Sequence, residues 1–326
     1  MTLLEFEDLR VTYTGSRGRI PAVRGVDLAV DAGEILGIAG ESGCGKSTLA
    51  MAVLRLLPRS AEVTGRILLD GEDLLTMGWG RLRAVRWTGA SIVFQGAMHS
   101  LNAVHRVGRQ VAEPILVHGE ASPAKAAARA EELLERVGLP PSRARSYPHE
   151  LSGGQRQRVM IAMALACDPD LIIADEATTA LDVMVQAQVL ELLTGLVAER
   201  GVGMVMISHD LSVLSAVCGT AAVMYAGRIV ERGPAHEVFA QARHPYSAAL
   251  GAAFPVIGDP ASRGRPGGLA GDPPDPARLP EGCSFRPRCA VAVERCGSES
   301  PELVAVQGAE RSSACFVAQE GGPVVL

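Results

Sequence analysis

The sequence lacks the features typical of a membrane-spanning, secreted or nucleic-acid-binding protein. Its longest apolar run, Val159 to Cys167, is about half of the 20 residues that a transmembrane helix needs. No basic-then-apolar leader opens the chain, which argues against a signal peptide. The formal net charge of −5 provides no basic excess to attract a phosphate backbone. We therefore expect a soluble, cytoplasmic protein.

The composition is that of an ordinary packed protein. Apolar residues make up 48% and charged residues 21% of the chain. A length of 326 residues favours about two domains. After Phe254 the chain becomes rich in proline and glycine, which is typical of a linker or a wrapped loop. The expected division is therefore 1–254 and 255–326.

The spacing of apolar residues predicts a mixed α/β fold. Alternation of period two indicates antiparallel strands, and compact apolar runs indicate buried parallel strands between helices. Antiparallel strands are expected over 3–13, 22–30, 66–74 and, around a tight turn at Ala226 and Gly227, within 221–233. Parallel strands are expected over 33–40, 171–176 and 203–210. Helices are expected over 46–57, 121–138, 152–169 and, between an Asp182 N-cap and Gly201, over 183–200.

A phosphate-binding loop follows the first parallel strand. The stretch GESGCGKST fits the pattern G-x-x-x-x-G-K-[ST]. Glycines let backbone N–H groups approach a β-phosphate, Lys46 reaches the β- and γ-phosphates, and the Ser47 hydroxyl holds Mg²⁺. The predicted phosphate-site residues are Gly40, Ser42, Gly43, Gly45, Lys46, Ser47 and Thr48.

An acidic pair ends the apolar strand LIIADE. Asp175 is expected in the Mg²⁺ shell, and Glu176 is expected to orient the water that attacks the γ-phosphate. Solvated acids at a strand end are common by chance, but the phosphate loop in the same chain favours the functional interpretation. Together the two features predict a nucleoside triphosphatase.

A second anion-binding segment is the run LSGGQRQR, which begins at Leu151. Its serine can cap a helix, and its glycines expose N–H groups at the positive helix end. The predicted contacts are Ser152, Gly153, Gly154 and Gln155. With this motif the chain resembles the ATP-binding subunits of ABC transporters, whose signature is LSGGQ. The resemblance implies that two subunits pack head to tail, each ATP lying between one Lys46 loop and the partner's Ser152 helix.

The resemblance also implies roles for four further residues. Tyr13 matches the aromatic residue that stacks on adenine, and Gln95 matches the glutamine that touches Mg²⁺ and senses the membrane subunits. Asp182 matches the loop that crosses the dimer interface, and His209 matches the histidine that contacts the γ-phosphate. The implied fold is a RecA-like P-loop NTPase core with an antiparallel β subdomain and an α-helical signature subdomain over about 96–168. A small Cys-rich C-terminal extension follows the core.

Three stretches narrow the resemblance to the branch of oligopeptide, dipeptide and nickel importers: ESGCGKS, YPHELSGGQRQRVMIAMALA and HPYSAAL. The final cysteines resemble the C-terminal extension of that branch, with the spacing C-x5-C-x6-C-x18-C. They are Cys283, Cys289, Cys296 and Cys315.

Three interpretations of these cysteines remain open. Zinc sites favour closer pairs such as C-x2-C, whereas a [4Fe–4S] cluster needs four thiolates, and the resembling branch is associated with such a cluster. We rank the [4Fe–4S] cluster first, zinc second, and free or disulfide-bonded thiols third. A segment with so little apolar content cannot fold on hydrophobic burial alone, so a metal would serve as a structural staple. This structural role is favoured over a redox role, because nothing nearby offers an electron acceptor.

The resemblance implies the ATP-hydrolysing motor of a di- or oligopeptide importer, peripheral on the cytoplasmic face of the cell membrane. Its implied partners are a second, related ATP-binding subunit, two permease subunits and a solute-binding protein. Alternatives are a motor for nickel or another small solute, a soluble ABC ATPase of repair or translation, and an iron–sulfur sensor. The chain has one cassette and no sustained heptads, which disfavours the soluble ATPases. Intact Glu176 and His209 disfavour the sensor.

Overall fold

The structure is a computed structural model of the chain. It describes residues 1–15, 18–94, 100–119, 121–178, 181–253, 269, 271–306 and 310–324. The chain divides into two compact units. The phosphate-loop unit comprises Glu5–Ala29, Ile35–Ile67 and Ser208–Leu326, and the signature unit comprises Met1–Leu4, Val30–Glu34 and Leu68–Ile207. The expected division at residue 254 stays a prediction.

The phosphate-loop unit contains three long strands side by side. They run in the order β2 (Gly18–Asp31), β1 (Thr2–Gly15) and β4 (Ala61–Leu69). Every second side chain of β1 is buried, at Leu4 and Phe6 and again at Leu9 and Val11, but the alternation shifts by one residue between the two pairs. The shift falls at Asp8, whose φ of 41° is left-handed, as in a bulge. The strands predicted over 3–13 and 22–30 are confirmed and are longer than expected. The strand predicted over 66–74 is wrong in its bounds, because the chain turns at Asp70 and Gly71, which both have positive φ.

A second sheet of the same unit carries the phosphate loop. Strand β3 (Ile35–Ala39) pairs parallel with β9 (Thr220–Tyr225), and β9 pairs antiparallel with β10 (Arg228–Pro234). All five residues of β3 are buried, as the apolar run predicts. The predicted turn at Ala226 and Gly227 joins β9 to β10, and both residues have positive φ.

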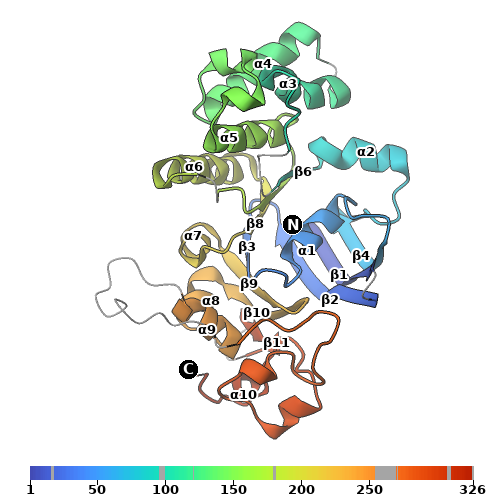
Figure 1. The fold of residues 1–326 in the computed structure, drawn as a ribbon, viewed down its shortest axis with the longest axis vertical. Coiled ribbons are helices and arrows are strands. Elements are labelled where there is room, and N and C mark those ends of the chain that lie inside the picture. The colour runs from blue at the N-terminus through green and yellow to red at the C-terminus, as the bar shows by residue number, and fades with distance from the viewer. Residues whose placement is uncertain are drawn as a thin grey trace. The chain divides into compact units, whose positions relative to one another are not determined.

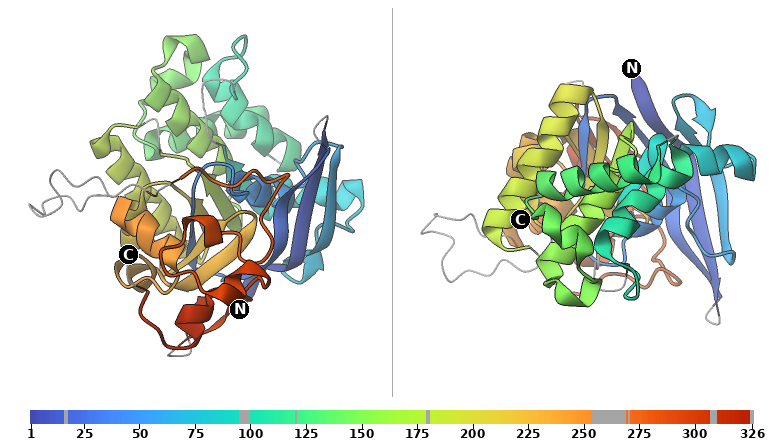
Figure 2. Two further views of the ribbon diagram at one scale, coloured as in Figure 1. Left: turned by 60° about the horizontal axis from the view of Figure 1, so that its bottom comes forward. Right: turned by 90° about the horizontal axis from the view of Figure 1, so that it is seen from above.

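The end of the chain extends this sheet. Strand β12 (Ser312–Ser313) pairs with β10, and β11 (Val304–Ala305) pairs with β12. Figures 1 and 2 show the C-terminal segment, coloured orange to red, beside β9 and β10. Its other elements are the 3-10 turns η4 (Arg286–Arg288) and η5 (Glu294–Gly297) and the short helix α10 (Phe316–Gln319).

Besides α10, the described part of this unit contains four helices. They are α1 (Lys46–Val53), α7 (Leu211–Val217), α8 (Ala235–Ala240) and α9 (Pro245–Ala253). The predicted helix over 46–57 is too long, because α1 ends in a turn with Arg55 at a φ of 50°. In that turn the Leu56 N–H donates to the carbonyl of Met51 at 3.0 Å, a Schellman-type ending. The periodicity analysis did not predict α7, α8 and α9.

The signature unit contains a parallel sheet of β6 (Ala90–Val93), β7 (Leu171–Asp175) and β8 (Gly203–Ile207). Strand β7 lies between the other two, which explains why all its residues are buried. Strand β5 (Glu72–Asp73) pairs with the end of β4. Helix α6 (Val183–Arg200) begins at the predicted Asp182 cap and ends at Gly201, whose φ is 67°.

Apart from α2, the remaining described helices of this unit form a helical group, visible in green in Figure 1. They are α3 (Val107–His118), α4 (Pro123–Arg136), the 3-10 turns η1 (Pro141–Arg145) and η2 (Pro148–Glu150), and α5 (Gly153–Ala164). The helix predicted over 152–169 is too long, because α5 ends at Ala164, four residues before Asp168, whose φ of 48° is left-handed. Helices α2 (Trp79–Thr88) and α3 were not predicted. Within the described residues, no helix has the length and apolar character needed to span a bilayer.

Candidate nucleotide-binding site

The phosphate loop connects β3 to α1, with two glycines packed against backbone. Gly40 and Gly45 have φ values of 152° and 110°. A Cβ on Gly40 would lie 2.3 Å from the carbonyl oxygen of Met224, and one on Gly45 would lie 2.3 Å from that of Ala22. Only glycine fits these positions without moving the neighbouring strands. The glycines of the motif are therefore required by the fold of the loop itself.

The predicted catalytic lysine lies inside this loop. Lys46 is the first residue of α1 and is 7% exposed. Its Nζ donates hydrogen bonds to the carbonyl of Gly40 at 2.7 Å and to that of Glu41 at 2.9 Å. Ser42 and Gly43 at the loop tip are exposed, and Ser47 is half-buried. The amides at the start of a helix have no intrahelical acceptor, so the loop presents donors and a cation to an anion.

Two further predicted residues lie in the same unit. Tyr13, on β1, has its hydroxyl 3.1 Å from Oγ1 of Thr48 in the first turn of α1. Thus β1 brings a half-buried aromatic ring to the phosphate-loop helix. His209 is exposed, and it lies beside Asp210, which caps α7 by accepting from the N–H groups of Ser212 and Val213.

The acidic pair lies in the signature unit, at the end of β7. Asp175 is the last residue of the strand and is 4% exposed. Glu176 is half-buried, and its N–H donates to the carbonyl of Ile207 on β8 at 2.9 Å. Its φ of 50° is left-handed, a conformation that costs a non-glycine residue about 1 kcal/mol or more. The hydrogen bond to β8 holds this strained turn directly after a buried strand.

The signature segment begins α5 with a reciprocal cap. Ser152 Oγ accepts from the Gln155 N–H at 3.2 Å, and Gln155 Oε1 accepts from the Ser152 N–H at 3.1 Å. A Cβ on Gly153 would meet nothing within 4 Å. Arg156 and Arg158 donate to the carbonyls of residues 148 and 138, which fixes the helix to preceding turns. The helix start is thus rigid, exposed at Ser152 and open above Gly153.

The remaining predicted residues differ in how much the structure describes. Asp182 is exposed and caps α6 by accepting from the Val185 N–H at 3.0 Å. Gln95 lies outside the described residues. The phosphate loop, Tyr13 and His209 belong to one unit, whereas Asp175, Glu176, the signature segment and Asp182 belong to the other.

Sequence reasoning missed two residues that contact the phosphate loop from the chain's C-terminal part. They are Tyr246, on α9, and Arg288, in η4, and both contact Glu41. The quoted motif HPYSAAL contains Tyr246 but gives no local indication of a contact 205 positions away.

The four C-terminal cysteines line one small pocket, together with His244 and Phe285. The N–H of Cys283 donates to the carbonyl of Cys296 at 3.0 Å, which brings two of the cysteine segments together. Burial raises the pKa of the Cys283 and Cys315 thiols and raises that of Cys289 to about 11.

Disulfide bonds are not formed in this structure. All seven cysteines lie in the part of the chain that the structure describes, and each is a free thiol. The disulfide interpretation is therefore not supported.

Among the described residues, no group of three or more Cys, His, Asp or Glu side chains is arranged around a single ion.

The glycine loop with its buried lysine and the acidic pair after a parallel strand define a P-loop nucleotide-binding protein. The chain matches the ABC transporter family over residues 23–179 and the C-terminal region of oligopeptide/dipeptide transporters over residues 230–296. It is 44% identical over 316 residues to the oligopeptide transport ATP-binding protein OppD of Salmonella typhimurium, covering 96% of this chain and 93% of that protein. OppD of Escherichia coli is also 44% identical over 316 residues, with the same coverage.

Solved structures support the same assignment. An ATP-binding cassette solved as a dimer in a post-hydrolysis state with ADP and Pi is 29% identical, with a TM-score of 0.66. The match covers 72% of this chain and 99% of that one. The chain therefore belongs to the ABC transporter family, in the branch of oligopeptide and dipeptide transport ATP-binding proteins, and has the mixed α/β cassette fold of an ATPase.

Proposed function

We propose that the chain is the ATP-hydrolysing motor of an importer for short peptides. The observation that carries the proposal is the match of residues 230–296 to the C-terminal region of oligopeptide/dipeptide transporters, which lies outside residues 23–179, the part matched by the general ABC transporter family. OppD relatives named for oligopeptide transport match across almost the whole chain. We propose that residues 1–254 form the ATP-binding domain and that residues 255–326 form a linker rich in proline and glycine followed by the Cys-rich extension.

The proposed chemistry is transfer of the γ-phosphoryl group of ATP to water. Lys46 neutralises charge on the β- and γ-phosphates, and Ser47, Asp175 and Gln95 hold Mg²⁺ directly or through water. Glu176 orients the attacking water, and His209 contacts the γ-phosphate. The left-handed turn at Glu176 and its bond to Ile207 support a fixed direction for that carboxylate.

Completion of the site requires a second cassette. The capped helix start at Ser152 exposes N–H groups and the positive end of α5, which suit a phosphate. We propose that Ser152, Gly153, Gly154 and Gln155 bind the ATP held by a partner's Lys46 loop, with Asp182 at the interface. The ADP-bound dimeric cassette supports this arrangement by analogy. A related chain is the proposed partner.

The proposed surroundings are those of a peptide importer. Two permease subunits would receive the closing motion of the paired cassettes through the segment that contains Gln95, and a solute-binding protein would deliver the peptide. The chain would lie at the cytoplasmic face of the cell membrane. Peptide uptake would then follow the cycle of ATP binding, closure, hydrolysis and reopening.

The experiment that tests the substrate is ATP turnover by the complete transporter reconstituted in liposomes. Peptide-loaded binding protein should stimulate turnover, and Lys46→Met should abolish the stimulation because the phosphate charge is no longer neutralised. Stimulation by nickel-loaded protein, with none by peptide, would favour the nickel alternative. ATP turnover that changes neither with the permease subunits nor with the loaded binding protein would favour a soluble ABC ATPase.

We also propose a [4Fe–4S] cluster on Cys283, Cys289, Cys296 and Cys315. Their four side chains line one pocket, and four thiolates are the donor set that such a cluster requires. When bound, the cluster supplies a covalent cross-link among these segments. Without a cation, burial keeps the thiols of Cys283, Cys289 and Cys315 protonated, so binding would release protons.

Iron and acid-labile sulfide in anaerobically purified protein test the cluster. We expect about four of each per chain, and the Cys296→Ser variant should lose most of both. Cys167→Ser is the matched control, because Cys167 is remote in sequence and lies in the other unit. One zinc ion per chain, or no metal in the wild type, would overturn this assignment.

A further inference from the structure

The segment between the first two C-terminal cysteines contacts the phosphate loop through an ion pair. Arg288 Nη1 donates to Glu41 Oε2 at 2.7 Å, and Nη2 donates to Oε1 at 2.9 Å. The Arg288 side chain is 5% exposed and that of Glu41 is 22% exposed. Such a two-pronged pair fixes orientation as well as distance. We propose that Arg288 is a positioning residue for ATP binding, which acts through Glu41 on Lys46; this rests on the phosphate loop binding ATP.

Glu41 is the residue through which the pair reaches the catalytic lysine. Its side chain binds Arg288, its N–H donates to Tyr246 Oη at 2.7 Å, and its carbonyl accepts from Lys46 Nζ at 2.9 Å. These three contacts therefore fix the side chain, the N–H and the carbonyl of Glu41. Movement of the Glu41 side chain would alter the carbonyl that orients Lys46.

Arg288 is itself held on an aromatic cluster of the same unit. Its guanidinium lies 5.9 Å from the ring centroids of both Tyr225 and Phe285, and Nη1 is 3.4 Å from Tyr225 Oη. Phe285 is 2% exposed and lies against Tyr225 and Tyr246, with centroids 5.2 and 5.5 Å away. The hydrogen bonds that Arg288 donates to Glu41 raise the pKa of the guanidinium, which therefore stays charged.

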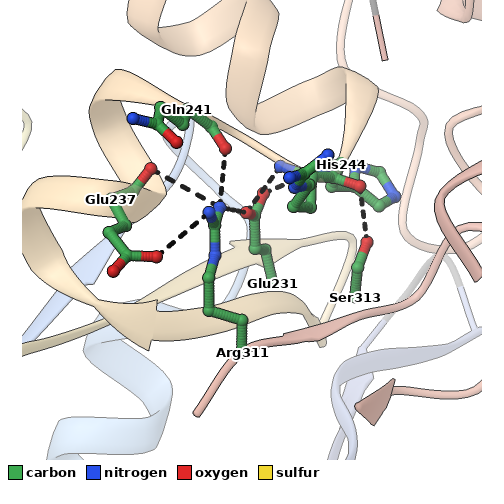
Figure 3. Close-up of polar contacts among 7 residues, drawn as sticks. Glu231, Glu237, Gln241, His244, Arg311 and Ser313 are labelled. Atoms are coloured by element: carbon green, nitrogen blue, oxygen red, sulfur yellow. Dashed lines mark hydrogen bonds and ion pairs between the residues drawn. The ribbon is translucent and has the colours of Figure 1, made fainter. Parts of the chain in front are cut away.

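A buried polar network supports the Tyr246 contact from the other side. Figure 3 shows Arg311, which precedes β12, donating to Glu231 Oε1 at 3.0 Å. The carboxylate of Glu231 also accepts from the N–H groups of Arg243 and His244, at 2.7 and 2.9 Å. His244 Nδ1 then accepts from the Tyr246 N–H at 3.0 Å. The end of the chain thus fixes the start of α9, which carries the Tyr246 hydroxyl to Glu41.

The energetics distinguish this role from ordinary packing. Removing one member of a buried ion pair leaves the other charge unpaired, whereas removing both is milder. A positioning role therefore predicts that the effect of changing Arg288 on ATP affinity depends on Glu41. A role in holding the C-terminal segment alone predicts no change in ATP affinity, because that segment has further contacts with β10.

Calorimetric titration of ATP and ADP into the purified full-length chain tests the proposal. Measurements are made at a temperature where circular dichroism shows every variant folded, so that the dissociation constant reports folded protein. We expect Arg288→Met to weaken binding about tenfold, corresponding to about 1.4 kcal/mol. Arg288→Lys keeps the positive charge but cannot form the two parallel hydrogen bonds, so its loss of ATP affinity should be smaller. The Arg286→Met variant is the matched control, because Arg286 is an exposed residue of the same turn.

The double-mutant cycle completes the test. In a Glu41→Gln background, Arg288→Met should weaken binding less than twofold further. Equal affinities of wild type and Arg288→Met, an undiminished effect in the Glu41→Gln background, or an equal loss in Arg286→Met would each overturn the inference. If Arg288→Met does not fold, the comparison of Arg288→Lys with wild type decides it. A wild-type chain that binds no ATP would instead refute the proposed function.

Discussion

His244 should make the stability of the phosphate-loop unit depend on pH. Its side chain is 2% exposed, and burial lowers its pKa from an ordinary 6.5 to about 3. Between these values the unfolded chain binds a proton that the folded chain excludes, so stability falls as the pH drops below 6.5. Lowering the pH from 7.5 to 5 should therefore remove about 2 kcal/mol from the free energy of unfolding through this residue alone.

The assay compares urea unfolding of the wild type and His244→Asn at both pH values, followed by circular dichroism. Asparagine offers an acceptor near the position of Nδ1, which accepts from the Tyr246 N–H, but does not titrate. The wild type should lose about 2 kcal/mol more than the variant over this pH change. His236→Asn, at a side chain that is 75% exposed, is the control and should behave as the wild type. Equal losses in the wild type and His244→Asn would refute the reasoning.

Two further substitutions test the geometry of the site. Gly45→Ala should weaken ATP binding at least tenfold, because its Cβ would lie 2.3 Å from the Ala22 carbonyl oxygen. Calorimetry measures the affinity, and the control Gly80→Ala should bind ATP unchanged, because its Cβ meets nothing within 4 Å. Unchanged affinity in Gly45→Ala would contradict the packing argument. Asp182→Ala should lower the free energy of unfolding by about 1 kcal/mol through loss of the α6 cap, whereas Asp182→Ser should keep most of it. Equal stabilities in a urea titration would count against the cap.

The local structure of the candidate site could be predicted from the sequence because each motif carries its own structural requirement. A positive φ at Gly45 and a cap at Ser152 are properties of a few consecutive residues. The strand before the phosphate loop contains no charged residue, and the strand that ends at Asp175 is apolar up to that residue, which makes both recognisable as buried parallel strands. The same holds for α6, whose cap and terminal glycine both occur where the sequence predicts them.

Contacts between distant parts of the chain could not be predicted in this way. Arg288 and Glu41 are 247 positions apart, and Arg311 and Glu231 are 80 apart. Nothing in the local pattern of either arginine distinguishes it from a solvated one, since the pairing depends on the fold. The ends of α1 at Val53 and of α5 at Ala164 were missed for a different reason, because apolar residues continue past both ends, and no glycine marks the left-handed residues Arg55 and Asp168 that follow them.

The rate of ATP hydrolysis by the Glu176→Gln variant tests the account most directly. Glutamine keeps the shape of the side chain but cannot accept a proton from the attacking water. Turnover by the purified transporter should fall by about 100-fold or more, while the dissociation constant for ATP stays within twofold of the wild type. Hydrolysis at the wild-type rate by Glu176→Gln would contradict the assignment of the catalytic site.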